Sequence, residues 1–427
     1  MLALGHVQDP WKLRTWLHGY LKEASAAAVG CVWLPRFSSA TNGARCLRRS
    51  EGVRHYSGSA LKKTACGSCG RAQSGWYDRR TRKARDLSCG DRRVYLEFEV
   101  RRIQCKRCGS VKRERLEFLA DNPFYTKRFA YYVGRRCRSA TIKDIAEELK
   151  LDWDTVKTLE KQYMAAQLAK AGTPGPKIIG IDEISIRKGH TYRIVVSDLI
   201  RGRPIWFGGE DRSEASMSQF YDWLGTRKTT GVRLAVMDMW KPFRNATAAH
   251  APQAAILFDK FHIMRHLGEA LDQVRKAEYR RLSGKDQRYI KGQKYTLLSH
   301  RENLTMEGRR SLKTLLAANK RLNTAYLLKE SFGQLWDYER EGWARRFFEN
   351  WWASLKWQRL APYEKFAEMI DRHWEGIAAY CRPENKVSLG FVEGLNNKIR
   401  VIQRRAYGLR DEEYLRLKVL TCMLPAL

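Results

Sequence analysis

The sequence predicts an α/β protein whose main domain is built around a central sheet. The apolar, mostly β-branched run 178–181 follows the breaker-rich stretch 172–176 and leads directly into Asp182, as is typical of a buried strand. Patterns for two more strands, a helix and two further strands follow at 191–199, 203–208, 214–224, 233–237 and 254–258. Three consecutive strands followed by alternating helix and strand is the order of a ribonuclease-H-like fold. We therefore expect that fold for the domain that spans residues 177–427.

Three carboxylates are placed where such a domain could use them. Asp182 ends the first strand, Asp238 ends the fourth, and Glu393 lies in the motif Gly390 to Asn397. The first and fourth strands of this fold lie side by side, so the two aspartates should be neighbours. Oxygen ligands suit hard cations such as Mg²⁺, and a pair of such ions can activate water and stabilise an in-line phosphoryl displacement. The sequence therefore predicts a magnesium site at these acids.

Two other acids compete for these roles. Glu183 directly follows Asp182, and strand alternation should turn it to the opposite face. Asp259 ends the last strand and could approach the site together with His262. The choice between Asp238 and Asp259 as the second aspartate is therefore open to a mutational test.

The charge of the chain points to a polyanionic partner. Lys and Arg number 80 against 46 Asp and Glu, which gives a net charge of +34 spread along the chain. Nucleic acid is the leading candidate, ahead of a ribosome or an anionic membrane surface. No apolar run approaches the roughly 18 residues of a membrane span, so we expect no membrane-spanning segment.

Two Cys-x-x-Cys pairs predict a zinc-binding module over residues 61–120. Each pair can form a knuckle whose two thiolates face one tetrahedral Zn²⁺, and the ligands would be Cys66, Cys69, Cys105 and Cys108. Residues 92–103 alternate apolar and charged positions, as expected for a hairpin inserted between the knuckles. The alternative is four unligated thiols, with Cys89 a weaker extra ligand candidate. Zinc knuckles rather than disulfides favour a reducing, cytoplasmic setting.

We assign no function to residues 1–60, which form an amino-terminal extension.

Residues 121–170 show the pattern of a helix-turn-helix domain. Helical spacing covers 125–139 and 141–149, and Asp152 can cap a third helix over 153–164. The third helix would present Thr155, Lys157 and Lys161 to a DNA groove. The alternative is a helical linker without DNA contacts. The stretch 171–176, with two prolines and two glycines, then separates this domain from the sheet.

The segment from about 263 to 380 reads as an all-helical insertion that divides Asp238 from Glu393. Its tryptophans recur beside apolar residues at helical spacing, so we expect core anchors rather than base-stacking platforms. On the helix predicted for 391–405, Glu393 shares a face with Asn397, and cations suited to phosphate follow at Lys398, Arg400, Arg404 and Arg405.

This order of zinc knuckles, helix-turn-helix and three acids resembles the DDE transposases of bacterial insertion sequences, specifically the ISL-three family. The match covers about residues 64–424, and its most specific motifs are 180–183, 187–190, 237–240, 258–262, 392–398 and 404–408. The resemblance implies strand cleavage and strand transfer at the ends of a mobile element. It also implies that Asp182, Asp238 and Glu393 carry Mg²⁺ or Mn²⁺.

The same resemblance sets the expected partners. They are double-stranded DNA, both the element ends and the target, and a second copy of the chain in a homodimer or higher assembly on DNA. The expected location is the bacterial cytoplasm, in association with the nucleoid. The competing hypothesis is a zinc-containing DNA-binding regulator whose ribonuclease-H-like domain is inert.

Overall fold

The structure is a computed structural model that describes residues 53–57, 63–187, 191–283, 287, 290–299, 301–387, 390–406 and 409–427. The chain divides into two compact units, one ending at Tyr132 and the other beginning at Val133. The expected amino-terminal extension lies outside the described residues, except for 53–57. Among the described residues, no helix is long and apolar enough to cross a membrane.

The first unit is a β module built on one long hairpin. Strands β4 (Asp78–Cys89) and β5 (Arg92–Cys105) pair antiparallel across a turn in which Gly90 has φ 61°. The hairpin predicted between the two knuckles is thus confirmed, with the alternating stretch 92–103 inside its second arm, β5. Strands β1 (Val53–Ser57) and β6 (Ser110–Arg113) pair with β5, and β2 (Thr64–Ala65) pairs with β3 (Ala72–Gln73).

Three helices follow, at α2 (Lys127–Arg136), α3 (Ile142–Leu149) and α4 (Trp153–Ala171). Helix α3 begins at a capping box in which Thr141 and Asp144 bond to each other's backbone N–H groups. Ile145, Leu149, Val156 and Leu159 are buried, as expected for a small helical core. The third helix is longer than the predicted 153–164. Asp152 stands at its N-cap as predicted, but its side chain makes no capping hydrogen bond.

The second unit contains a five-stranded sheet in the order β11-β10-β7-β8-β9. The strands are β7 (Ile178–Arg187), β8 (Thr191–Asp198), β9 (Arg203–Gly208), β10 (Leu234–Met237) and β11 (Ala255–Phe258). Strands β7, β8 and β9 form an antiparallel meander, and β10 and β11 run parallel to β7. Helices α5 (Glu214–Leu224), α6 (Thr226–Thr229) and α7 (Lys241–His250) connect the later strands. All five predicted strands are present, and only β7 extends far beyond its predicted end. Asp182, predicted to end the first strand, therefore lies within β7, opposite Val195 of β8.

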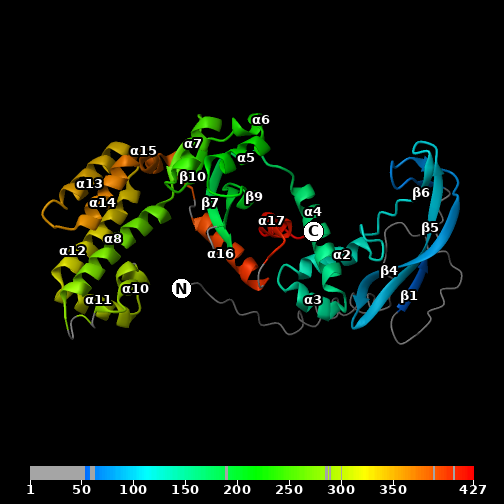
Figure 1. Ribbon diagram of the computed structural model, residues 1–427, viewed down its shortest axis with the longest axis horizontal. Helices are drawn as coiled ribbons and strands as arrows, with labels where there is room; N and C mark the ends of the chain where they lie inside the picture. Colours follow the sequence, from blue (N-terminus) through cyan, green and yellow to red (C-terminus); the bar gives the residue numbers. More distant parts are fainter. Residues whose placement is uncertain are drawn as a thin grey trace, which may run out of the picture. The chain divides into compact units, whose positions relative to one another are not determined.

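The described residues after β11 are helical (Figure 1). The α-helices are α8 (Lys260–Arg281), α10 (Lys294–Leu298), α11 (Met306–Ala318), α12 (Lys320–Phe332), α13 (Glu341–Ala353), α14 (Ala361–Arg372), α15 (Trp374–Ala378), α16 (Gly390–Arg405) and α17 (Glu412–Thr421). Four short 3₁₀ helices lie at η1 (Arg301–Asn303), η2 (Gly333–Asp337), η3 (Ala379–Cys381) and η4 (Pro383–Asn385).

One continuous apolar core joins the sheet to these helices. Ile179 of β7 and Phe258 of β11 belong to the same cluster as Phe332 of α12 and Trp351 of α13. The tryptophans of the segment divide in two. Trp336 and Trp351 are buried and Trp352 and Trp374 pack against the core as predicted, whereas Trp343 and Trp357 are exposed.

Helix α16 packs directly on β7. A Cβ atom added to Gly180 would lie 2.9 Å from the Val392 Cγ2 atom, so this position tolerates no side chain while the helix stays in place. Leu395 and Ile399 of α16 bury against Ile184 of β7. The helix is therefore held against the strand that carries Asp182.

Candidate active site and metal centre

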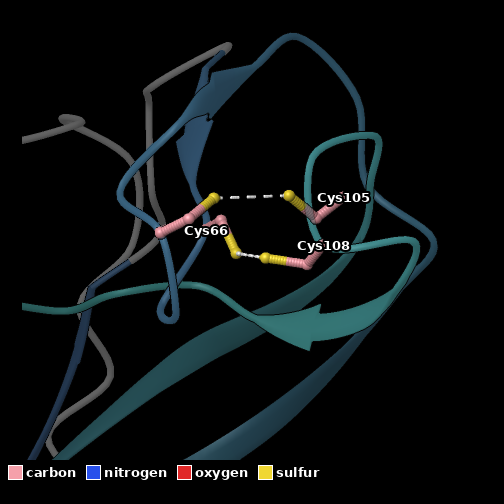
Figure 2. A group of neighbouring side chains, drawn as sticks. Cys66, Cys105 and Cys108 are labelled. Carbon is pink, nitrogen blue, oxygen red and sulfur yellow. Dashed lines mark hydrogen bonds between the residues drawn. The ribbon is translucent and has the colours of Figure 1, made fainter.

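Four cysteine side chains converge between the two knuckles of the first unit. Their sulfur atoms all lie within 4.8 Å of one another, with Cys66 to Cys108 at 3.9 Å and Cys69 to Cys105 at 3.5 Å. Figure 2 shows the side chains pointing toward one another from two loops. A tetrahedral zinc ion with Zn–S bonds of about 2.3 Å would set the sulfurs roughly 3.8 Å apart. The observed spacing fits that ion.

The two knuckles have the same backbone geometry. The N–H of Gly70 donates to the carbonyl of Cys66, and the N–H of Gly109 donates to the carbonyl of Cys105. Both glycines have positive φ, at 72° and 66°, a conformation that glycine adopts at low cost. The glycine after each second cysteine is thus explained by its turn. Cys89, the weaker ligand candidate, is exposed and is not a member of the cluster.

The charge of this cluster also calls for a cation. The backbone N–H of Cys108 lowers the pKa of Cys105 to about 6, whereas its neighbours Cys69 and Cys105 raise the pKa of Cys108 to about 12. Ionisation of one thiol therefore opposes ionisation of its neighbours, and a bound Zn²⁺ would offset that repulsion.

The second unit brings Asp182 and Asp238 to the same point of two neighbouring strands. Strand β10 pairs parallel with β7 in a register that matches Val236 with Gly180. Continued by two residues, this register sets Asp238 beside Asp182. Burial raises the pKa of Asp182, and the charge of Asp238 raises it further, while His262 and Asn396 lower it. The two carboxylates therefore repel each other at short range.

Helix α16 adds a third side of the cluster. Asn396 donates a hydrogen bond of 2.5 Å from Nδ2 to an Asp182 carboxylate oxygen. Glu393 is exposed on the same helix, and its charge contributes to the raised pKa of Asp259, after burial and with Asp238. All three predicted acids thus border one electrostatic cluster, which also contains the rival Asp259.

Asp259 has a structural task at the start of α8. Its Oδ1 atom accepts a hydrogen bond of 2.9 Å from the Phe261 N–H and caps the helix. His262, one turn along, lowers the pKa of both Asp182 and Asp259. The cap fixes the position of Asp259 but leaves its second carboxylate oxygen available to the cluster.

Glu183 interacts with the carboxylate cluster, although strand alternation predicted that it would turn to the opposite face of the strand. Its pKa is raised by burial and then by the charges of Asp238 and Asp182. Alternation gives the faces of β7, but Asp238 lies beyond the end of β10 and can approach both residues. Arg212 holds Glu183 Oε1 at 3.1 Å, and the Oε2 atom is buried without a hydrogen-bond partner.

Sequence reasoning missed the roles of Asn396 and Arg212. Asn396 lies three residues after Glu393, so helical spacing could have placed it on nearly the same face. Arg212 gave no signal, because it follows β9 in a turn and reaches the site only in the folded sheet. Its guanidinium lies over the Tyr192 ring at 4.4 Å and the Trp240 ring at 4.7 Å.

The carboxylate cluster has the donor atoms for hard cations but is wider than a single-ion site. Within the part of the chain that the structure describes, the four cysteines are the one group of three or more ligand side chains gathered closely enough to hold an ion. Two ions about 3.5–4 Å apart would need ligands spread over a wider space. The buried, unpartnered oxygens of Glu183 and Asn396 also fit a site that receives cations.

Comparisons with known proteins agree with the order of these sites. A family model described as "Transposase" matches residues 179–419. The models "Helix-turn-helix domain of transposase family ISL3" and "zinc-finger of transposase IS204/IS1001/IS1096/IS1165" match residues 114–164 and 62–108. The chain belongs to the ISL3 family of transposases.

Curated relatives support this assignment over most of the chain. The "Transposase for insertion sequence element IS1001" of Bordetella parapertussis is 34% identical over 366 residues, which cover 84% of this chain and 89% of the relative. The "Transposase for insertion sequence element IS1557" of Mycobacterium tuberculosis is 28% identical over 377 residues, or 82% of this chain and 83% of the relative. The predicted family and its transposase function are confirmed, and the cysteine cluster is the structural zinc site of the zinc-finger segment.

Two of the predicted DNA-binding lysines of the transposase lie against its own α17. Lys157 Nζ is 2.9 Å and Lys161 Nζ is 2.8 Å from the same Asp411 oxygen, and Lys157 also lies over the Tyr414 ring. Thr155 is half-buried on the same helix. We expected all three to face a groove. In this structure the two lysines are partly covered, because α17 packs on that side of α4.

A buried network fixes this packing. Glu160 of α4 is 2% exposed, and it accepts hydrogen bonds from the Tyr414 hydroxyl and from Lys418 Nζ, both on α17. Lys418 also donates to the carbonyl of Cys137, the residue directly after α2. The helix-turn-helix segment of the transposase is thus joined to α17, the helix that follows α16, through the buried Glu160 and its two partners.

The predicted phosphate-binding residues of α16 are distributed differently. Arg400 and Arg404 are exposed, and Arg405 donates to the Arg138 carbonyl at 3.0 Å. Lys398 is exposed with its Nζ 3.3 Å from the Met423 sulfur. Lys398 and Arg405 also line a hollow of about 870 Å³ between the helix-turn-helix segment and α16–α17.

Proposed function

We propose that this transposase cleaves and joins DNA strands by DDE-type phosphoryl transfer, with Asp182, Asp238 and Glu393 as the acids that hold Mg²⁺ or Mn²⁺. The observation that carries the proposal is the β7–β10 register, because its continuation by two residues would set Asp238 beside Asp182. The Asn396–Asp182 hydrogen bond supports Glu393 as the third acid, because it holds α16 at the same strand.

The sheet supports a ribonuclease-H-like domain. An antiparallel meander of β7, β8 and β9 is extended by parallel β10 and β11, which is the arrangement that the sequence predicted for that fold. The described elements between β11 and α16 are helical, which supports an insertion that divides the second acid from the third.

The residues around the acids suit charge-demanding chemistry. Bound divalent cations would polarise phosphate oxygens and activate the attacking water or hydroxyl. Asn396 orients Asp182 by donating to one of its oxygens, and Arg212 restrains Glu183 at the edge of the cluster. Asp259 is anchored as a helix cap, which supports a positioning role for it rather than the role of second aspartate.

Recognition of the element end is assigned to α4, with Thr155, Lys157 and Lys161 as its DNA-facing residues. Residues of α4 would recognise the DNA sequence. Phosphate contacts that do not depend on the DNA sequence would come from Lys398, Arg400, Arg404 and Arg405. Contact by both lysines requires them to exchange Asp411 for phosphate. A homodimer or higher assembly on the two element ends, associated with the nucleoid, completes the proposal.

The decisive experiment compares cleavage with binding on the element's own end DNA. Asp182→Asn, Asp238→Asn and Glu393→Gln should each abolish Mg²⁺-dependent cleavage and leave end binding nearly intact, because each removes a negative ligand while preserving size. Asp259→Asn is the matched control and should retain cleavage. If Asp259→Asn were silent while Asp238→Asn cleaved, the second aspartate would be misassigned. End binding by a wild-type protein that never cleaves would favour the inert-regulator alternative.

A further inference from the structure

The zinc-binding unit carries a basic hollow that none of the assignments above uses. The hollow has a volume of about 690 Å³, within the roughly 300–1,000 Å³ of small-ligand pockets. Its lining includes the adjacent aromatic residues Trp76 and Tyr77, which precede β4. Trp76 is 44% and Tyr77 is 66% exposed, so both rings offer a large apolar surface to solvent.

Each of these rings is backed by an arginine from β5. The Arg101 guanidinium carbon lies 4.4 Å from the centre of the Trp76 ring, and that of Arg102 lies 5.8 Å from the centre of the Tyr77 ring. Arg101 is only 4% exposed, and Arg102 is held by a 2.7 Å hydrogen bond from Nε to Asp78. The two guanidinium groups are therefore held in place against the rings. The exposed surface of each ring can accept a second planar group.

The charge around the hollow has one sign. Lys63, Arg71 and Lys106 line it together with Gln73, Ser74 and Gln104, and no carboxylate is among its described lining residues. The nearest acid along the chain, Asp78, is already paired with Arg102. The hollow therefore combines planar apolar faces with positive charge that no carboxylate among its described lining residues offsets.

We propose that this hollow binds an unpaired nucleotide of a DNA strand. The base stacks on Trp76 or Tyr77, and the flanking phosphates meet Lys63, Arg71 and Lys106. Aromatic platforms inside a basic groove are the general means of holding single strands, because every base has a stacking face. In a duplex these faces are occupied by neighbouring bases, so paired DNA would use the cations but not the rings. The inference does not depend on which acids are catalytic.

The test uses the full-length chain and measures binding without added magnesium. One probe is a blunt duplex of the element end, and the other is the same duplex with a short single-stranded tail that contains 2-aminopurine. We expect the wild-type protein to bind the tailed probe about 5-fold or more tightly than the blunt one, at the low end of the effect of one stacked base. Stacking should also quench the fluorescence of the 2-aminopurine.

The variants separate stacking from charge and from folding. Trp76→Ala with Tyr77→Ala should lose both the tail preference and the quenching, whereas Trp76→Phe with Tyr77→Phe should keep most of both. Phe124→Ala is the matched control, because Phe124 is an exposed aromatic of the same unit, 63% accessible, whose backbone bonds to Arg85 farther along β4. It should behave as wild type. Zinc content, measured for every variant, reports whether the module has folded.

Several outcomes would overturn the proposal. If the zinc-loaded Trp76→Ala, Tyr77→Ala protein still preferred the tailed probe, the two rings would not be the binding site for the tail. Equal loss in Phe124→Ala would show a general effect on the module. A tail made of RNA that binds more tightly than the DNA tail, or a wild-type protein without any tail preference, would exclude single-stranded DNA as the ligand.

Discussion

Asn396 on α16 donates a hydrogen bond to Asp182 on β7 across a separation of 214 residues in the chain. The bond has a length of 2.5 Å and joins the helix that carries Glu393 to the strand that carries the first aspartate. Hydrogen bonds that orient metal ligands contribute to metal affinity and activity even when they touch no metal themselves. Asn396 is therefore the first residue outside the acids to examine.

Asn396→Ala should lower metal-dependent cleavage by about 10- to 100-fold and raise the Mg²⁺ concentration needed for half-maximal rate. Asp182 would keep its charge but lose the donor that orients it. Asn397→Ala is the matched control, since the adjacent Asn397 is exposed and accepts only from Arg400 within the contacts described here. Cleavage assays over a Mg²⁺ titration check both variants. Equal rates for the two would assign Asn396 no role at the site.

Asp182→Asn should stabilise the metal-free protein at neutral pH. Burial and then Asp238 raise the pKa of Asp182 above its ordinary 3.8, so the folded state holds this proton more tightly than the unfolded state. Stability is therefore lost as pH rises through the raised pKa, and the loss is complete above it. The neutral asparagine of Asp182→Asn does not ionise, so the variant does not lose this stability. The melting temperature should therefore rise by a few degrees, since each kcal/mol gained in the free energy of unfolding raises it by about 2–4 °C.

The pH dependence of the melting temperature distinguishes the loss of a buried negative charge from a stabilisation by Asp182→Asn that has another cause. The gain in melting temperature from Asp182→Asn should shrink as pH falls toward 4, because the wild-type carboxyl then becomes protonated. Asp154→Asn, an exposed aspartate on α4, should give no such gain. Added Mg²⁺ should raise the melting temperature of the wild type more than that of Asp182→Asn. A gain that is constant with pH would reject the electrostatic cause.

Asp411→Asn should strengthen binding to DNA and make it more sensitive to salt. Lys157 and then Lys161 hold the pKa of Asp411 below its ordinary value, so at neutral pH the carboxylate pairs with both lysines and offsets one of their two positive charges. Asparagine can still cap α17 through Tyr414 N–H but carries no charge. If both lysines then meet phosphates, the slope of log K against log salt should steepen by up to about 1.8. Glu413→Gln, which releases only Arg416 of the same helix, is the control.

Loss of one zinc ligand should unfold the first unit without the rest of the chain. Cys108→Ser should abolish the single Zn²⁺ expected per chain, because three remaining thiols no longer close the coordination sphere. Cys89→Ser should retain the ion, since Cys89 is exposed and outside the cluster. Elemental analysis gives the zinc content, and proteolysis of the 63–132 region reports folding. Full zinc content in Cys108→Ser would contradict the four-ligand site.

The sequence predicted the strands well because each has a strong local signal. Apolar runs such as 178–181 and 234–237 are buried, and the parallel pairing of their strands follows from the order of elements. The contacts that complete the site have no such signal. The Asn396–Asp182 bond depends on how α16 packs, and the covering of Lys157 by α17 depends on a helix about 250 residues away. Periodicity shows which face of a helix is polar, but not what covers that face.

The shared core of sheet and helices limits how far the second unit can be reduced to a catalytic fragment. Phe332 and Trp351 belong to the cluster that contains Ile179 and Phe258, and a Cβ atom on Gly376 would meet the Phe258 ring at 2.5 Å. Deleting residues 282–387 would bring the acids closer in sequence but remove the part of this cluster that packs on Phe258 of β11. An engineered minimal transposase would therefore need replacement side chains for that packing before its carboxylates could be positioned at all.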